Sequence, residues 1–119
     1  MLKEKIKGYI EKIRKIEGVL GCVLISRDGI MLGRSMEGEF NEPWLAAMCA
    51  TLFASAESAS GILKMAPPEA VSVMIEDRSV IVIGAGEKLL IVAMIRDGGE
   101  RSALFQALAD LAREIGGSF

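Results

Sequence analysis

Residues 18–29 read Gly-Val-Leu-Gly-Cys-Val-Leu-Ile-Ser-Arg-Asp-Gly, and this stretch indicates the fold class. In an extended Val19–Ser26 segment, alternate side chains point to opposite faces, and both faces are apolar. A strand that is apolar on both faces belongs in the middle of a sheet that is covered on both sides. The Asp28-Gly29 pair that follows predicts a type I′ hairpin turn, which requires positive φ at both central residues.

The flanking sequence predicts helices and strands by its apolar spacing. Apolar residues recur at intervals of three and four over residues 2–17, which is typical of an amphipathic helix, and Gly18 ends it. Asn41 or Glu42 can cap a later long helix, with Pro43 in its first turn. The remaining expected elements are a return strand over 30–33 that can extend to Ser35, the long helix over about 43–64, strands over 71–76, 80–83 and 89–95, and a last helix over about 100–115 closed by Gly116-Gly117.

Composition restricts the classes of function. The 119 residues fit one domain, 1–119, and a net charge of −2 gives no general attraction to nucleic acid. The chain has no histidine, which excludes Ser-His-Asp and Cys-His catalysis and imidazole-ligated metal sites. Cys22 and Cys49 stand alone in apolar segments, so we expect small buried side chains rather than a disulfide. Because no signal-peptide pattern precedes the first helix, we expect a cytoplasmic protein.

The first helix is basic although the chain is acidic. Residues 2–17 carry six basic and three acidic side chains, which leaves this segment at +3 and the remainder at −5. A basic amphipathic helix can bind a membrane surface or an acidic partner, and it can equally be the solvated side of a helix packed on a core. Both interpretations stay open.

The long helix is apolar or small around most of its circumference. Glu57 is its sole charged residue between Trp44 and Leu63, yet its alanines, serines and threonine make it too weakly hydrophobic for a membrane span. The stripe expected to face the sheet is Leu45, Met48, Leu52, Ala56, Ala59 and Leu63. A second stripe, whose small side chains would let a partner helix approach closely, is Ala47, Ala50, Ala54 and Ser58. Cover by loops of the same chain is the alternative.

No motif predicts catalysis, a cofactor or a metal. Gly84-Ala85-Gly86 lacks the third glycine of a dinucleotide fingerprint and a following helix, so it is interpreted as a hairpin turn. The acidic pairs at Glu76-Asp77 and in residues 37–42 are expected to be solubilising, with contact to a partner as the alternative. The methionines are expected to fill the core, with an adaptable binding surface as the alternative.

Four arginines fall at predicted strand ends: Arg27, Arg34, Arg78 and Arg96. Such side chains are usually solvated. A minor alternative is that one of them stabilises phosphoryl-transfer charge in a bound nucleotide-hydrolysing partner.

The order helix, two strands, long helix, three strands, helix, together with residues 18–29, resembles the Roadblock family of dynein light chains and prokaryotic regulators of Ras-like GTPases. The resemblance implies an α/β (α+β) fold with a five-stranded antiparallel sheet, the long helix on one face and two terminal helices on the other. It also implies a homodimer formed through the long helix and the next strand. Carried onto this chain, the dimer contacts are Ala47, Ala50, Ala54, Ser58, Val71, Val73 and Ile75.

The resemblance further implies a function without catalysis. The leading hypothesis is a homodimeric scaffold or regulator that binds a small Ras-like GTPase and modulates its nucleotide cycle or localisation. The second is a purely structural adaptor in a larger motor- or membrane-associated complex, and the third is a small-molecule sensor. Partners are therefore expected to be a second copy and a small GTPase, not nucleic acid, and no integral membrane segment is expected.

Overall fold

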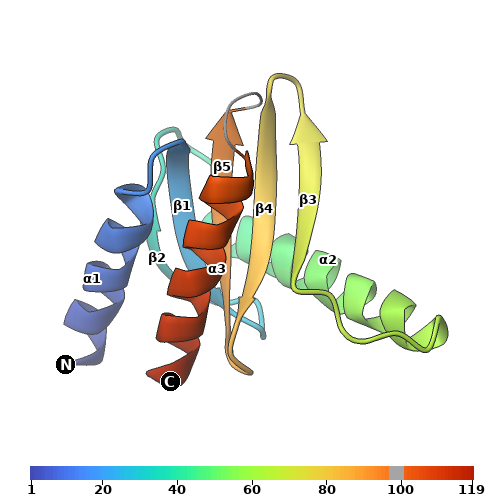
Figure 1. Cartoon of the computed structure of the whole chain (residues 1–119). Coiled ribbons are helices and arrows are strands. Elements are labelled where there is room, and N and C mark those ends of the chain that lie inside the picture. The colour runs from blue at the N-terminus through green and yellow to red at the C-terminus, as the bar shows by residue number, and fades with distance from the viewer. Residues whose placement is uncertain (97–100) are drawn as a thin grey trace.

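The chain builds one antiparallel sheet with helices on both faces (Figure 1). The computed structural model describes residues 1–96 and 101–119, and within them three helices and five strands follow in the predicted order. The elements are α1 (Leu2–Arg14), β1 (Val19–Ser26), β2 (Met31–Ser35), α2 (Glu42–Ile62), β3 (Ala70–Ile75), β4 (Arg78–Ala85), β5 (Leu89–Arg96) and α3 (Arg101–Gly117). The predicted turn at 97–99 and the predicted helix start at residue 100 lie outside the described residues.

The strand order across the sheet is β2-β1-β5-β4-β3, and every neighbouring pair is antiparallel. β1 and β5 are therefore central, while β2 and β3 form the two edges. Helices α1 and α3 cover one face, and α2 covers the other (Figure 1). The predicted fold class, with one long helix opposite two terminal helices, is confirmed.

The two apolar faces of β1 fill two separate cores, as its sequence predicts. Cys22 and Leu24 pack into the core under α1 and α3, whereas Val23 and Ile25 pack into the core under α2. All four side chains are fully buried. Each core depends on the same central strand, so the hydrophobic effect holds both helical layers to the sheet at once.

The turn after β1 differs from the prediction. Gly29 has a φ of +87°, but Asp28 is not among the described residues with positive φ, so the turn is not type I′. The Gly29 amide donates to the Ser26 carbonyl at 3.0 Å, and the register of β1 against β2 shifts between Leu24 and Ile25. The Ser26 amide also donates to the Ile30 carbonyl at 2.9 Å, so residues 27–29 form the connection and Gly29 supplies its single left-handed residue. The bulge lies farther along the hairpin, at Leu32.

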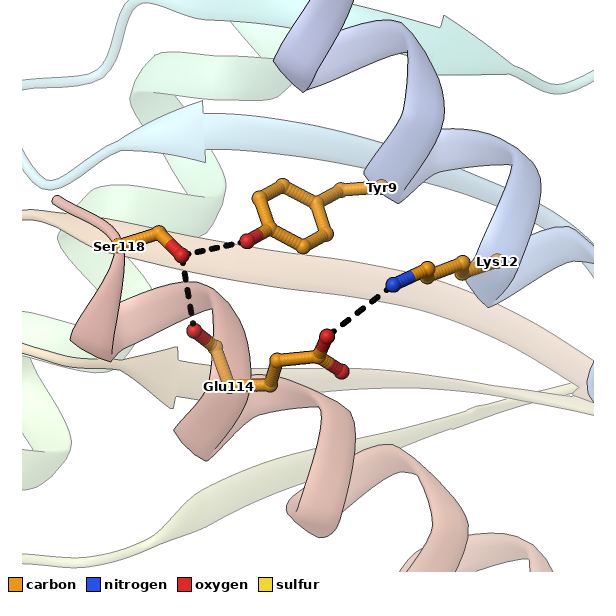
Figure 2. A network of polar contacts seen from close by, with 4 residues as sticks. All are labelled: Tyr9, Lys12, Glu114 and Ser118. Atoms are coloured by element: carbon orange, nitrogen blue, oxygen red, sulfur yellow. Dashed lines mark hydrogen bonds and ion pairs between the residues drawn. The ribbon is translucent and has the colours of Figure 1, made fainter.

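Side chains of α1 make polar contacts with the C-terminal end of α3 and the residue after it (Figure 2). The Tyr9 and Ser118 hydroxyls hydrogen-bond at 2.5 Å, and Lys12 Nζ donates to Glu114 Oε1 at 3.0 Å. α1 ends at Arg14 rather than at residue 17, and the chain then turns through Gly18 at a φ of +99°. The lysine–glutamate pair is half-exposed, so it is worth at most about 1 kcal/mol.

α3 ends at Gly117, as the predicted Gly116-Gly117 stop implies, and Gly116 also packs closely against another part of the chain. A Cβ at Gly116 would lie 2.5 Å from the Gly86 nitrogen and 2.8 Å from the Gly86 Cα. The end of α3 therefore touches the backbone of the β4–β5 turn directly. That turn is where the sequence predicted it, with Gly86 at a φ of +71°.

We predict that Gly116→Ala destabilises the protein by about 1–3 kcal/mol, because the added methyl group would overlap rigid backbone. Gly8→Ala is the matched control, since outside the neighbouring backbone of its own helix nothing lies within 4 Å of a Cβ at this position. The control should gain up to about 1 kcal/mol from alanine's higher helix propensity. Urea unfolding followed by circular dichroism at one protein concentration checks both values, and equal midpoints for the two variants would contradict the close contact.

We also predict that ionisation of Cys22 lowers the free energy of unfolding at alkaline pH. Burial raises the pKa of the Cys22 thiol from 9.0 to about 11, against a smaller lowering by Arg14, so the fold favours the neutral thiol. This stabilisation is complete below pH 9 and is lost as the pH rises from 9 through 11. The stability difference between wild type and Cys22→Ala should therefore shrink over this range in urea titrations, and a constant difference would contradict it.

Candidate functional site

The outer face of α2 carries large apolar side chains that its own chain leaves uncovered. Trp44, Met48 and Ile62 are 72%, 62% and 81% exposed. Together with three small polar residues they form a line with alternating spacings of four and three, which runs along one side of a helix. This exposed α2 stripe consists of Trp44, Met48, Thr51, Ser55, Ser58 and Ile62.

The inner face of α2 differs from the predicted one. The residues buried against the sheet are Ala46, Cys49, Ala50 and Phe53. Of the stripe expected there, Leu45 and Leu52 are half-buried against this core, but Met48, Ala59 and Leu63 are exposed. The reason is the close approach of the β1–β2 hairpin, because a Cβ on Gly29 would lie 3.1 Å from the Ala47 Cα. Small residues therefore face the protein's own hairpin.

The predicted dimer contacts on α2 fall into different environments. Ala54 and Ser58 are exposed, Ala47 is half-buried beside the hairpin, and Ala50 is buried under its own chain. Ala50 is therefore unavailable at the surface of the protomer. Thus the four-residue face expected from the sequence does not exist as one surface.

The predicted contacts on β3 lie on an open edge of the sheet. β3 pairs with β4 on one side and is the last strand in the order, so its other side has no neighbour in the described part of the chain. Val71 and Val73 are half-buried, and Ile75 is 52% exposed. An unpaired edge with apolar side chains is a site for pairing with another strand.

The C-terminal half of α2 extends past β3, beyond the edge of the sheet (Figure 1). Ile62, Leu63 and Met65 at this end are 81%, 68% and 68% exposed. We call residues 58–65 the overhang. Its exposed apolar side chains and the open β3 edge are both available for contact with another chain.

A further part of the sheet on the α2 side is incompletely buried. Val80 and Met94 are half-buried cross-strand neighbours there, next to Ile75. Arg78 and Arg96 lie directly opposite each other at the end of the same strands, and both are exposed. Like charges directly opposite each other destabilise a sheet. Asp77 offsets part of this repulsion, because its Oδ1 lies 3.8 Å from Arg78 Nε.

Two of the strand-end arginines are held inside the protomer and are not solvated as expected. Arg27 donates to Glu57 Oε2 at 3.1 Å and to the Gly86 carbonyl at 2.8 Å, and its guanidinium lies 5.1 Å from the centre of the Phe53 ring. These contacts attach α2 to the β4–β5 turn. Because Arg27 is engaged in this way, its guanidinium is not extended toward a partner.

Arg34 organises the acidic loop before α2. Its guanidinium donates to Glu42 Oε2 at 2.6 Å and to the carbonyls of Met36 and Gly38, the latter at 2.8 Å, and it stacks on Phe40. Glu42 therefore has a structural contact, contrary to the solubilising role expected for it. Glu37 and Glu39 are exposed as predicted.

Other kinds of site find little support in the described residues. Across 1–96 and 101–119, no group of three or more aspartate, glutamate or cysteine side chains is placed to hold a metal ion. Within the same residues, α2 has the length and hydropathy of a membrane span, a property shared by core helices of soluble proteins. Its Glu57 pairs with Arg27, and its inner face packs on the sheet.

Comparison with known proteins agrees with this architecture. The family model of the Roadblock/LC7 domain matches residues 6–94. The uncharacterized protein MJ0714 of Methanocaldococcus jannaschii is 23% identical over 92 residues, which are 77% of this chain and 78% of the relative.

Two solved structures share the fold at low sequence identity. MglB of Myxococcus xanthus superposes with a TM-score of 0.87 at 12% identity, covering 98% of this chain and 89% of that one. The gliding protein mglB of Thermus thermophilus gives 0.83 at 18% identity, covering 97% and 88%. With a family model matching most of its length, the chain belongs to the Roadblock/LC7 family.

Proposed function

We propose that this protein is a noncatalytic homodimeric scaffold that binds a small Ras-like GTPase and modulates its nucleotide cycle or localisation. The observation that carries the proposal is the exposed α2 stripe beside the open β3 edge. Large apolar surfaces of this kind mark protein interfaces. The Roadblock family, as the sequence resemblance implies, includes regulators of Ras-like GTPases.

The stripe is complementary to a second copy of itself. If two α2 helices pack antiparallel about a twofold axis opposite residue 53, Trp44 faces the partner's Ile62 and Met48 faces the partner's Ser58. Thr51 then faces the partner's Ser55 in the middle. Large side chains thus meet at the ends and small ones at the centre, where two helices approach most closely. A twofold interface requires this kind of self-complementarity.

The β3 edge supports the same arrangement. Antiparallel pairing of two β3 strands would join two five-stranded sheets into one and remove the open edge from solvent. The overhang of each α2 would then lie over the partner's sheet, where Val80 and Met94 are half-buried and Ile75 is exposed within one protomer. Val71 and Val73 would lie at this seam, as the sequence predicts.

Charge at this contact acts in both directions. The overhang would bring the C-terminal end of one α2 toward Arg78 and Arg96 of the other protomer, where the helix carbonyls attract positive charge and Lys64, just after the helix, repels it. The interface is therefore expected to depend on apolar contacts and strand pairing, with at least a standard size of roughly 1,200–2,000 Å².

The dimer would act on a GTPase by conformation. A rigid surface that binds one arrangement of the partner's switch segments better than another shifts their equilibrium, and with it nucleotide exchange or hydrolysis. The paired α2 helices and the surface around them are the expected docking site. With Arg27 and Arg34 held by contacts within the protomer, we do not assign either of them to the partner's nucleotide.

A structural adaptor is the second candidate. The same dimer surface could join larger assemblies without any effect on nucleotide turnover. The apolar faces of the sheet are filled by leucine, isoleucine, valine and methionine, so a small-molecule sensor is less well supported.

We predict that wild type sediments at micromolar concentration with twice its 12.8 kDa chain mass. Ser55→Arg and Ile62→Lys should raise the dimer dissociation constant at least about tenfold, which corresponds to about 1.4 kcal/mol, because each places a charge in the helix pairing. Leu2→Lys is the matched control, since Leu2 is 60% exposed on the opposite layer. A monomeric wild type would contradict the proposed dimer and the scaffold function that depends on it.

We predict nucleotide-dependent binding to a cognate small Ras-like GTPase. Pull-downs with the immobilised GTPase should recover more of this protein in one nucleotide state, GDP or GTP analogue, than in the other. The Ile62→Lys variant should be recovered less than wild type in both nucleotide states. Turnover assays separate the two candidates, because a regulator changes the rate of GTP hydrolysis or exchange and an adaptor leaves it constant. Absence of nucleotide-dependent binding to every cognate GTPase would argue against the regulator.

A further inference from the structure

The sheet has a second open edge at β2, on the opposite side from β3. β2 pairs with β1, and no other strand in the described part of the chain lies beside it. All five of its residues are half-buried, whereas most residues of β1 and β5 are fully buried. Because the proposed dimer contact lies at the other edge, the properties of β2 do not depend on how two copies pack.

One residue of β2 directs its backbone groups away from the sheet. The Ser26 amide donates to the Ile30 carbonyl, which places this amide on the β2 side of β1. Amides alternate in direction along a strand, so the Leu24 amide also faces β2, where Gly33 is its register partner. Gly33 therefore uses its own N–H and C=O toward β1, and those of the next residue, Arg34, face the open side. An extended segment beside β2 can pair with these groups.

Helix α1 lies over this edge of the sheet (Figure 1). A Cβ at Gly33 would lie 3.0 Å from Ile6 Cγ2 and 3.2 Å from Ile10 Cγ1, so the helix sits directly on β2. Its other flank faces α3, because Lys12 pairs with Glu114 there. A helix with its side chains is about 10–12 Å across, and strands lie about 4.8 Å apart. The side of α1 away from α3 therefore reaches past the edge of the sheet.

That side of α1 carries positive charge. Lys3 and Lys7 lie seven and three residues before Ile10, and Arg14 lies four residues after it, so all three neighbour Ile10 on the helix surface. All three side chains are exposed. Arg14 donates to the Val19 carbonyl and keeps its charge, whereas Lys3 and Lys7 take part in no hydrogen bond or ion pair with residues 1–96 or 101–119. Two cations above the β2 edge are thus unpaired within this part of the chain.

The two sides of the edge differ in character. Glu4 and Glu11 lie farther round α1, toward solvent, so the side chains above the edge are cationic. On the α2 side, Arg34 is neutralised by Glu42, and Met31 packs on the apolar core. Successive residues of an added strand point alternately to these two sides. Acidic side chains toward α1 and apolar side chains toward α2 would therefore both be favourable.

We propose that the β2 edge binds a short extended segment of a partner protein, in which acidic and apolar residues alternate, as a sixth strand beneath α1. Lys3 and Lys7 meet its acidic side chains, and the Arg34 backbone pairs with it. The bulge at Leu32 limits the regular register to residues 33–35, so backbone pairing alone is weak and the charge of α1 decides which segments bind. The site leaves α2 and the β3 edge free.

The test measures fluorescence anisotropy of three labelled ten-residue peptides with the full chain at low salt. The first peptide alternates glutamate with valine, and the second alternates lysine with valine. The third repeats the first with every backbone amide N-methylated, so it keeps the charge and cannot donate a hydrogen bond. We expect the first peptide to bind at least about tenfold more tightly than either of the others.

Two variants and one local measurement place the site. The double variant Lys3→Glu/Lys7→Glu should weaken the first peptide at least about tenfold, because the reversed charges repel it. Lys64→Glu/Lys88→Glu is the matched control, since it changes the net charge equally at exposed positions outside α1 and β2, and should leave the affinity within about twofold. Hydrogen exchange of the Arg34 amide should slow when the first peptide binds.

Several results would overturn this proposal. Equal affinity for the first and the N-methylated peptide would show attraction by charge without strand pairing. Unchanged affinity in Lys3→Glu/Lys7→Glu, or unchanged exchange at Arg34, would place binding elsewhere. No binding of the first peptide at millimolar concentration would mean that the lysines only keep other strands away from the edge. A monomeric wild type contradicts the proposed dimer and leaves this site untouched, so the two failures are distinguishable.

Discussion

A sheet that is apolar on both faces must be covered twice, and this chain covers its two faces unequally. β1 and β5 are buried on both sides, so neither face can be left to water. Helices α1 and α3, which are joined by the Lys12–Glu114 contact, cover one face, whereas α2 alone covers the other. The excess of apolar surface on α2 and the open β3 edge both follow from this imbalance, and a second copy of the chain can correct both together.

The attachment of α2 explains how the helix can carry an exposed apolar side without detaching. Small inner residues let the β1–β2 hairpin approach, and Phe53 fills the space that remains. Arg27 adds directional contacts by joining Glu57 on α2 to the β4–β5 turn, and Gly84 leaves room for its guanidinium. The same turn contacts Gly116 at the end of α3. The two helical layers therefore meet at one end of the sheet, and this contact keeps α2, the helix of the proposed docking site, rigid.

The surface divides into parts with different physical character, and this division suggests separate roles. The α2 side is apolar with small residues at its centre, which suits pairing with an identical helix. The opposite side has a groove beside α3, lined by apolar residues together with Glu69, Arg101 and serine hydroxyl groups. The basic residues of α1 are partly engaged within the protomer, since Lys5 donates to the Ser118 carbonyl and Lys12 pairs with Glu114. We therefore place the main interactions on the sheet edge and on α2.

The element order, the bounds of β1 and the two-sided burial of the sheet could all be predicted from the amino-acid pattern, because apolar periodicity and glycine positions act locally. Which side of α2 faces inward is instead set by packing in three dimensions. An alanine-rich helix has nearly equal apolarity on every side, so its periodicity offers several candidate faces, and the close contact of Gly29 with Ala47 selects one. That selection buries Ala50 and exposes Met48, the reverse of the expectation. The contacts of Arg27 were beyond prediction because the fold brings its partners Glu57 and Gly86 close from far along the chain. The partners of Arg34 are near in sequence, but the loop conformation that turns them toward its guanidinium has no sequence pattern.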